Sequence, residues 1–127
     1  LRVPVDCRET ADVVAREHGN IHRSTDLSAA ALVRLLERCD AIRKPARFAE
    51  ILLACECDAR GRLGFEESAY PQRPRLLAVL GAVQSVVTRE IAAQAAAKGQ
   101  SGPQVGALIH QARVEAVAQW LKAPTAL

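Results

Sequence analysis

Apolar residues recur every three or four positions along most of this chain of 127 residues, with polar and charged residues between them. This spacing is typical of helices that bury one face, and no segment shows the two-residue alternation of a strand. The pattern predicts helices over residues 5–18, 29–42, 45–60, 74–98 and 105–121. We therefore predict an all-α fold, an irregular bundle of about five to seven helices.

Helix boundaries are marked by residues that commonly begin or end helices. Ser28 is a predicted N-cap, and Gly19 is expected to end the first helix. Residues 64–72 lack periodicity and form the clearest boundary in the chain. This boundary predicts two parts, residues 1–63 and residues 64–127.

The composition is rich in Ala, Leu and Val, with aromatic residues at only 3% of positions. Ala favours closely packed helices, because it is the strongest helix former and lets a neighbouring helix approach. Seventeen basic residues against 14 acidic ones give a net charge of +3, which does not by itself indicate a nucleic-acid-binding protein. Nearly all the basic residues are arginines; this favours bidentate phosphate contacts but fits a genome of high GC content equally well.

Several classes of protein do not fit the sequence. No run of about 18 apolar residues is present, which predicts no membrane span, and the start of the chain lacks a signal-peptide pattern. The four cysteines fit neither a disulfide framework nor CxxC metal spacing, so we expect a cytoplasmic protein. The chain contains no Met and opens with Leu1-Arg2-Val3-Pro4, which predicts a domain taken from a longer protein.

His18 and His22 have the His-x-x-x-His spacing that zinc-binding helices use. Gly19-Asn20 lies between them and predicts that the helix ends there, which would separate the two imidazoles. The alternative without a ligand is a loop histidine or a charge near a helix C-terminus. We assign no metal ligand and keep His18, His22 and Asp40 as secondary candidates for holding a metal ion.

Three cations, Arg43, Lys44 and Arg47, cluster around the start of the third predicted helix. Exposed backbone N–H groups at a helix start and arginine side chains together favour phosphate binding. The alternative is a solvated charged face in which Asp40 and Glu37 neutralise the arginines.

Two further segments combine glycine with basic residues. Arg60 and Arg62 flank Gly61, where a ligand can approach the backbone, although both arginines would also complement a helix C-terminus. Residues 98–106, beginning with Lys98, are similar to turns that grip a phosphate group. They lack the Gly-Lys-Ser/Thr ending of a nucleotide-binding loop and fit an ordinary connection between helices equally well. No pattern of catalytic side chains is present, so the residues alone predict a helical module that favours phosphate.

Taken in order, several motifs resemble the C-terminal half of bacterial CCA-adding enzymes, in particular the multifunctional kind with a His-Asp phosphohydrolase domain. The most specific motif is Asp58-Ala59-Arg60-Gly61-Arg62, with the aromatic loop through Tyr70-Pro71-Gln72. The resemblance covers nearly the whole chain. The other matching residues are Leu1-Arg2-Val3-Pro4, Glu17-His18, Ile21-His22, Arg43-Lys44-Pro45-Ala46-Arg47, Lys98-Gly99 and Arg113.

The resemblance implies a parent protein that adds C and A nucleotides from CTP and ATP to the tRNA 3′ end, with Mg²⁺ held in an N-terminal head. It also implies a His-Asp phosphohydrolase domain that acts on 2′,3′-cyclic and 2′-phosphates and can hold a transition metal. Residues 1–63 would be the later part of that domain, and residues 64–127 a helical segment that contacts tRNA.

On this basis we expect a chain without catalytic residues or a cofactor of its own, which contacts the tRNA backbone. Two alternatives stay open: a remnant of a metal-dependent phosphohydrolase, and a helical interaction module. The residues expected to bind RNA are Arg43, Lys44, Arg47, Arg60, Arg62, Lys98 and Arg113.

Overall fold

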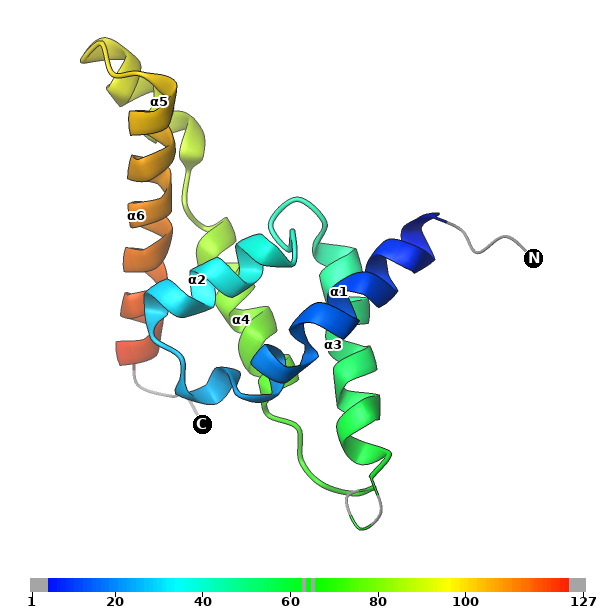
Figure 1. Ribbon diagram of the computed structural model, residues 1–127. Helices are drawn as coiled ribbons and strands as arrows, with labels where there is room; N and C mark the ends of the chain where they lie inside the picture. Colours follow the sequence, from blue (N-terminus) through cyan, green and yellow to red (C-terminus); the bar gives the residue numbers. More distant parts are fainter. Residues whose placement is uncertain (1–4, 63, 65, 124–127) are drawn as a thin grey trace.

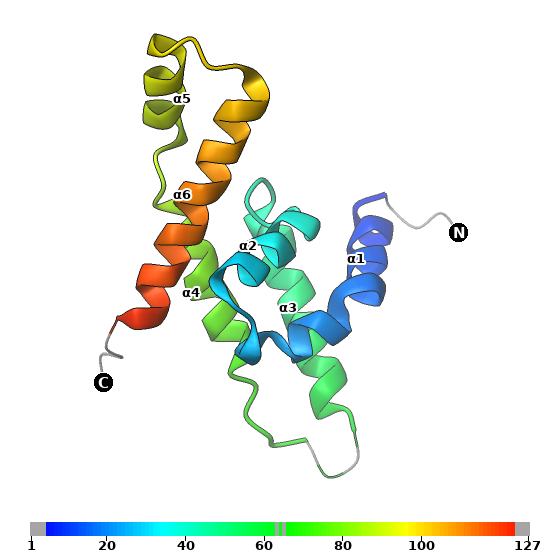
Figure 2. The ribbon, with the colours of Figure 1, turned by 60° about the vertical axis from the view of Figure 1, so that its left-hand side comes forward.

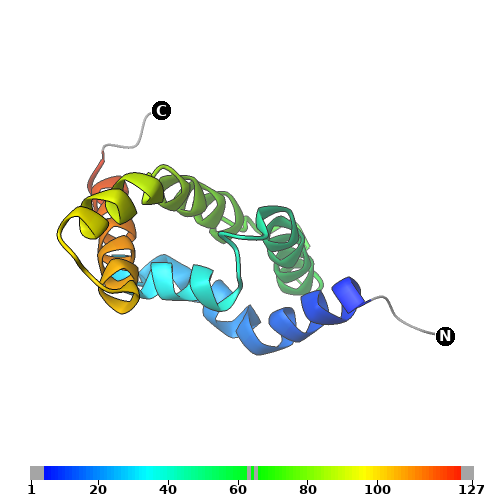
Figure 3. The same cartoon turned by 90° about the horizontal axis from the view of Figure 1, so that it is seen from above.

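The computed structural model describes residues 5–62, 64 and 66–123, and over these residues it contains helices and no strand (Figure 1). The all-α prediction is therefore confirmed. Seen from above, α1 and α2 lie along one side, α3 and α4 along the other, and α5 and α6 at one end (Figure 3). The elements are α1 (Val5–His22), a 3₁₀ helix (Ser24–Asp26), α2 (Ala29–Arg38), α3 (Pro45–Arg60), α4 (Gln72–Gln84), α5 (Thr88–Ala97) and α6 (Gly102–Lys122).

One hydrophobic core is built by side chains from α1, α2, α3, α4 and α6. It crosses the predicted boundary after residue 63, because α6 packs against both α2 and α4. Burial of one large aliphatic side chain contributes about 1.5–3 kcal/mol to stability. The core residues are Val13, Ile21, Leu32, Val33, Leu35, Leu36, Cys39, Ala41, Phe48, Ile51, Leu52, Cys55, Tyr70, Leu76, Val79, Leu80, Val83 and Val117.

The helices α2 and α3 form as their sequences predict. The Oγ atom of Ser28 accepts a hydrogen bond from the backbone N–H of Ala31 at 3.2 Å, which confirms the N-cap. Pro45 stands in the first turn of α3, where its missing N–H costs nothing. Both helices bury the predicted apolar stripes, among them Leu36 and Phe48.

The first helix is longer than the sequence predicts, because it continues through Gly19 and ends at His22. Gly within a helix costs about 1 kcal/mol relative to Ala. This cost is offset because the extra turn buries Ile21 completely. The Asn20 side chain adds a hydrogen bond from Nδ2 to Glu17 at 3.1 Å.

The predicted long helix over residues 74–98 is in fact two helices, α4 and α5, separated at Ser85–Val87. Ser85 donates its hydroxyl to the carbonyl of Ala82 at 2.6 Å, and such local bonds compete with the helix. Val87 then takes an extended backbone conformation, which suits its β-branched side chain.

By length and composition alone, residues 72–97 are apolar enough for a helix that crosses a membrane, a criterion that core helices also meet. The break at Ser85–Val87 divides this segment into two shorter helices. Leu76, Val79 and Leu80 from its first half are buried in the core. The first half of the segment, α4, therefore belongs to the hydrophobic core.

The last helix also departs from its predicted pattern. Within the described residues of α6, Val117 is the buried member of the predicted stripe, while Leu108 remains 41% exposed. The reason is visible in Figure 2, where α5 and the first half of α6 project as a hairpin beyond the other helices. The first half of α6 packs against α5 and contacts α2 through His110, so its apolar face is incompletely covered.

An ion pair between a buried carboxylate and a half-exposed arginine connects α1 to the end of α2. Glu17 is 2% exposed, and one carboxylate oxygen accepts a hydrogen bond from Arg38 Nε at 2.6 Å. Burial opposes ionisation of Glu17, but the hydrogen bonds and charges of Arg38, Asn20 and Arg16 outweigh burial and lower the pKa of the carboxyl group below 4.5.

The Glu17→Gln variant tests this pair. We expect the free energy of unfolding at pH 7 to fall by about 1–2 kcal/mol, since Gln keeps the shape but loses the charge. A carboxylate with a lowered pKa stabilises the folded state above its ordinary pKa of 4.5, and this contribution disappears as the pH falls. In urea titrations the difference from the unmodified chain should therefore shrink below about pH 5, whereas Glu67→Gln at an exposed site should show no such dependence.

Gly99 ends α5 in a left-handed backbone conformation with φ of +70°. The N–H of Gln100 donates to the carbonyl of Ala95, and the N–H of Gly99 donates to that of Ala96, both at 3.0 Å. This is the hydrogen-bonding pattern of a helix end that requires positive φ, so glycine is favoured here.

Gly99→Ala should lower the free energy of unfolding by about 1 kcal/mol, because a Cβ atom disfavours this conformation. Gly106→Ala is the matched control within α6, where a Cβ would meet no atom within 4 Å. It should raise stability by about 0.5–1 kcal/mol. Equal effects of the two variants in thermal unfolding would contradict the assignment of the turn.

Candidate functional site

The predicted RNA-binding cations do not converge on one site. Arg43, Lys44 and Arg47 surround the start of α3, and Arg60 and Arg62 lie at its other end. A helix of 16 residues is about 24 Å long, so the two groups are well separated. The others lie elsewhere: Lys98 at the end of α5 and Arg113 within α6.

The group at the start of α3 is partly engaged in internal contacts. The Arg47 side chain is only 15% exposed; it forms an ion pair with Glu9 at 3.1 Å and donates to the Cys39 carbonyl at 3.1 Å. Lys44 lies 3.5 Å from the same Glu9 carboxylate. Arg43 is 75% exposed, which leaves it the most accessible cation of the group.

Asp40 shapes the turn that precedes this group. It has φ of +54°, a left-handed conformation that Asp tolerates better than most residues, and its N–H donates to the carbonyl of Glu37. Its carboxylate lies 3.1 Å from Arg43, so the predicted neutralisation by Asp40 is present. Glu37 instead lies 2.7 Å from His110 Nδ1. The structure thus gives Asp40 a role in ending α2.

At the other end of α3, His22 joins three segments of the chain. Its Nδ1 atom is 2.8 Å from the Tyr70 hydroxyl, and its Nε2 atom is 3.2 Å from the Asp58 carboxylate. The Gln72 amide donates to the His22 backbone carbonyl at 2.9 Å. These bonds fix the end of α1 to α3 and to the start of α4.

Tyr70 stands at the centre of this cluster and is 7% exposed. Burial first, and the nearby Cys55, Asp58 and Glu56 next, raise the pKa of the Tyr70 hydroxyl well above 10, so it stays protonated at neutral pH. It therefore can donate to His22 Nδ1 while the Nε2–H of His22 donates to Asp58.

A cavity of about 280 Å³ adjoins this cluster and is lined by His22, Tyr70 and Gln72 together with Arg60 and Arg62. Arg60 is held in place, since its Nε donates to the Ser68 carbonyl at 3.0 Å and its Nη2 lies 3.5 Å from Glu56. Arg62 is exposed, and no ion pair to it is found among the described residues. The cavity thus has a cationic rim with one fixed and one accessible arginine.

The contacts of Asp58, Tyr70 and Gln72 with His22 were not predicted from the sequence. The segment around Tyr70 has no periodicity, so its burial could not be predicted from spacing. The only available signal was the joint presence of Asp58 and Tyr70-Pro71-Gln72 in the motif that resembles CCA-adding enzymes.

The expected separation of His18 from His22 is wrong, because α1 continues through both residues. Their rings lie one helical turn apart, with centroids 5.9 Å apart. Within the described ranges no group of three or more His, Cys, Asp or Glu side chains converges as metal ligands would. His18 Nδ1 faces the carbonyl of Val14 at 3.0 Å, and both His22 nitrogens have partners already.

The Gly-rich turn after Lys98 connects α5 to α6. Its backbone N–H groups are engaged locally: the N–H of Ser101 donates to the side chain of Gln104 at 2.7 Å. Lys98 is exposed at the end of the hairpin, whereas Arg113 is half-buried and its Nε has no hydrogen-bond partner among the described atoms. This geometry fits the interpretation as a connection between helices.

Comparison with known proteins gives high similarity to one group. The chain is 79% identical over 121 residues to the "Multifunctional CCA protein" of Verminephrobacter eiseniae, a match that covers 95% of the chain and 29% of the relative. It is 76% identical over 123 residues to the protein of that name from an Acidovorax strain, covering 97% and 29%. By sequence, nearly the whole chain is thus similar to part of each of these multifunctional CCA proteins.

The chain spans less than a third of the length of the multifunctional CCA proteins that it matches. A more distant relative, from Leptothrix cholodnii, is 56% identical over 118 residues, which are 93% of the chain and 28% of that protein. No family profile matches the chain, and no solved structure matches it.

Tyr70→Phe tests the cluster around His22. Loss of the hydroxyl should lower the free energy of unfolding by about 1 kcal/mol, because His22 Nδ1 loses its buried partner. Asp58→Asn removes a charge whose side chain is 53% exposed, and it should cost less than about 0.5 kcal/mol. The prediction would fail if Tyr70→Phe were neutral in denaturant titrations.

Proposed function

We propose that this chain is the tRNA-supporting, non-catalytic C-terminal part of a CCA-adding protein. The observation that carries the proposal is the 79% identity over 95% of the chain to a multifunctional CCA protein. In this proposal the parent protein acts in the cytoplasm and adds C and A nucleotides from CTP and ATP to the tRNA 3′ end, with Mg²⁺ bound in another part of the polypeptide.

The exposed cations supply the proposed contacts with the tRNA backbone. Arg43 and Arg62 are exposed at the two ends of α3, and Lys98 is exposed at the end of the α5–α6 hairpin. Arginine forks bind phosphate oxygens in pairs, and contacts at widely separated points of the protein fit an extended ligand such as tRNA. Arg47 takes a different role in this proposal, since its ion pair with Glu9 holds α3 against α1.

A second candidate is a metal-dependent phosphohydrolase function, favoured by the position of His18 and His22 on one face of α1. The side chains present do not complete a site, because both His22 nitrogens have partners in Tyr70 and Asp58. Metal analysis of the purified chain and a hydrolysis assay with a 2′,3′-cyclic nucleotide test this candidate. Bound metal together with turnover would favour it over the tRNA-supporting role.

Titration of the chain with tRNA at several salt concentrations tests the proposed function. Between 50 and 200 mM salt we expect the affinity to fall by roughly tenfold or more, because each phosphate contact releases counterions. Arg62→Ala should weaken binding and reduce the salt slope by about 1. Arg89→Ala makes the same charge change at an exposed site on α5, and it should leave the affinity and the salt slope unchanged.

Salt-independent binding would contradict the phosphate contacts. Equal losses of tRNA affinity in Arg62→Ala and Arg89→Ala would indicate that net charge alone determines binding. That result would contradict the assigned interface. Complete absence of binding at low salt would favour the helical interaction module over a tRNA-binding segment.

A further inference from the structure

The helix α5 has few contacts with the hydrophobic core. Among its described residues only Ala95 is buried, whereas α4 buries four apolar side chains. The helix against which α5 packs extensively is α6. Figures 1 and 2 show α5 beyond α1 to α4, beside the first half of α6. Because burial of apolar surface is the main favourable term in folding, α5 gains little stability from its position.

The contact between α5 and α6 is itself incompletely packed. A cavity of about 270 Å³ lies along the two helices, and its lining includes Ile91 and Ala95 from α5 and Leu108 and Ala112 from α6. Leu108 stays 41% exposed. Protein interiors normally leave few voids larger than a water molecule, so this pair of helices forms fewer dispersion contacts than a core pair does.

Polar interactions do not replace the missing packing. Val87 precedes the first turn of α5, and no side chain caps the backbone N–H groups there. Over the described part of the chain, no ion pair or side-chain hydrogen bond joins α5 to another helix. Isolated helices shorter than about 12–15 residues are marginal in water, and α5 has 10 residues. We therefore expect α5 to remain helical only while it is docked on α6.

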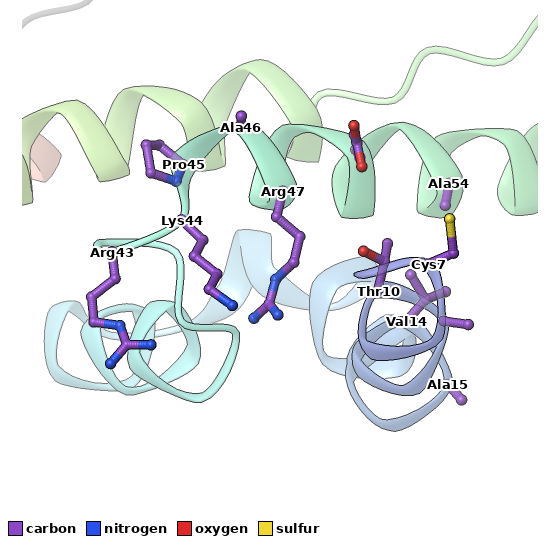
Figure 4. Close-up of a pocket in the computed structure, with 12 residues that line it drawn as sticks. Cys7, Thr10, Val14, Ala15, Arg43, Lys44, Pro45, Ala46, Arg47 and Ala54 are labelled. Atoms are coloured by element: carbon purple, nitrogen blue, oxygen red, sulfur yellow. The ribbon is translucent and has the colours of Figure 1, made fainter. Parts of the chain in front are cut away.

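A position at the edge of the molecule does not by itself produce this weakness. The helix α1 also lies at an edge (Figure 3), yet its Ile21 is completely buried. Arg47, which projects from α3 in Figure 4, forms an ion pair with Glu9 of α1 at 3.1 Å. Arg38 holds Glu17 of α1 at 2.6 Å. These anchors join α1 to α2 and α3, and α5 has no counterpart of them among the described residues.

We propose that α5 opens as a unit while the other helices stay folded, with Ser85–Val87 and the turn at Gly99 as its two hinges. The first hinge is a break between helices, and the second has φ of +70° and no atom within 4 Å of an added Cβ. The second half of α6 keeps its place because Val117 is buried in the core. Opening uncovers the face of α6 that carries Leu108 and Ala112.

Opening also moves a cation. Lys98 directly follows α5 and is exposed, whereas Arg43 and Arg62 lie at the ends of α3, which stays folded. In the proposed function, opening therefore changes the distance from Lys98 to the other RNA contacts, and the hairpin can adapt to the RNA surface. This consequence rests on the proposed function, but the opening of α5 does not.

Hydrogen exchange of the 127-residue chain, measured by NMR without RNA, tests the proposal. After correction for intrinsic rates, we expect the amides of α5 to exchange at least about tenfold faster than the slowest amides of α3. Low concentrations of urea should scarcely change the rates in α5, because local opening exposes little surface. The same urea should accelerate the slowest amides of α3, which exchange when the whole chain unfolds.

Ile51→Val provides a second test within the core. Ile51 is completely buried in α3, and loss of one methylene group there should make the slowest amides of α3 exchange about two- to tenfold faster. The amides of α5 should keep their rates, because their opening leaves the core intact. Equal acceleration of α5 and α3, or one common rate and urea dependence for both helices, would overturn the proposal. Since RNA is absent, a failure of tRNA binding would contradict the proposed function and leave this result intact.

Discussion

The arrangement of this molecule depends on a single hydrophobic core shared by the two parts of the chain. Val117 from α6 and four residues of α4 pack in the same cluster as the stripes of α2 and α3. Because protein interiors are closely packed, this cluster fixes the directions in which α1, α3 and α4 leave it. The His22 cluster, the Glu17–Arg38 pair and both ends of α3 take their positions from that packing.

The periodic pattern was sufficient to predict the helices that form the core, since the stripes of α2 and α3 repeat at helical spacing over several turns. The pattern failed where contacts between distant parts of the chain determine the structure. Burial of Ile21 favours the extension of α1 past Gly19. The hydrogen bond from the Ser85 hydroxyl to the Ala82 carbonyl lies where the predicted fourth helix divides in two. Tyr70 and Asp58 lie far from His22 in the sequence, and no local signal predicts that the three meet. Leu108 of the predicted stripe of α6 stays exposed because the α5–α6 hairpin leaves the core.

For the candidate site, the sequence located the basic residues but could not show which of them are free. An arginine next to a helix start has the same sequence signature whether it reaches solvent, as Arg43 does, or holds two helices together, as Arg47 does. That difference arises from Glu9, which comes from another helix. The structure thus divides one predicted cluster into an accessible cation and a structural one. In the proposed function, the accessible cations contact tRNA, and the structural cation holds the helices that carry them in place.

The most direct measurement is an NMR titration of the arginine Nε–Hε signals with tRNA. We predict that the signals of Arg43 and Arg62 shift together at one stoichiometry, while those of Arg47 and Arg89 stay in place. Their joint response would mean that both ends of α3 contact the same RNA molecule. Small uniform shifts over all arginines, or shifts of Arg47 as large as those of Arg43, would contradict the account.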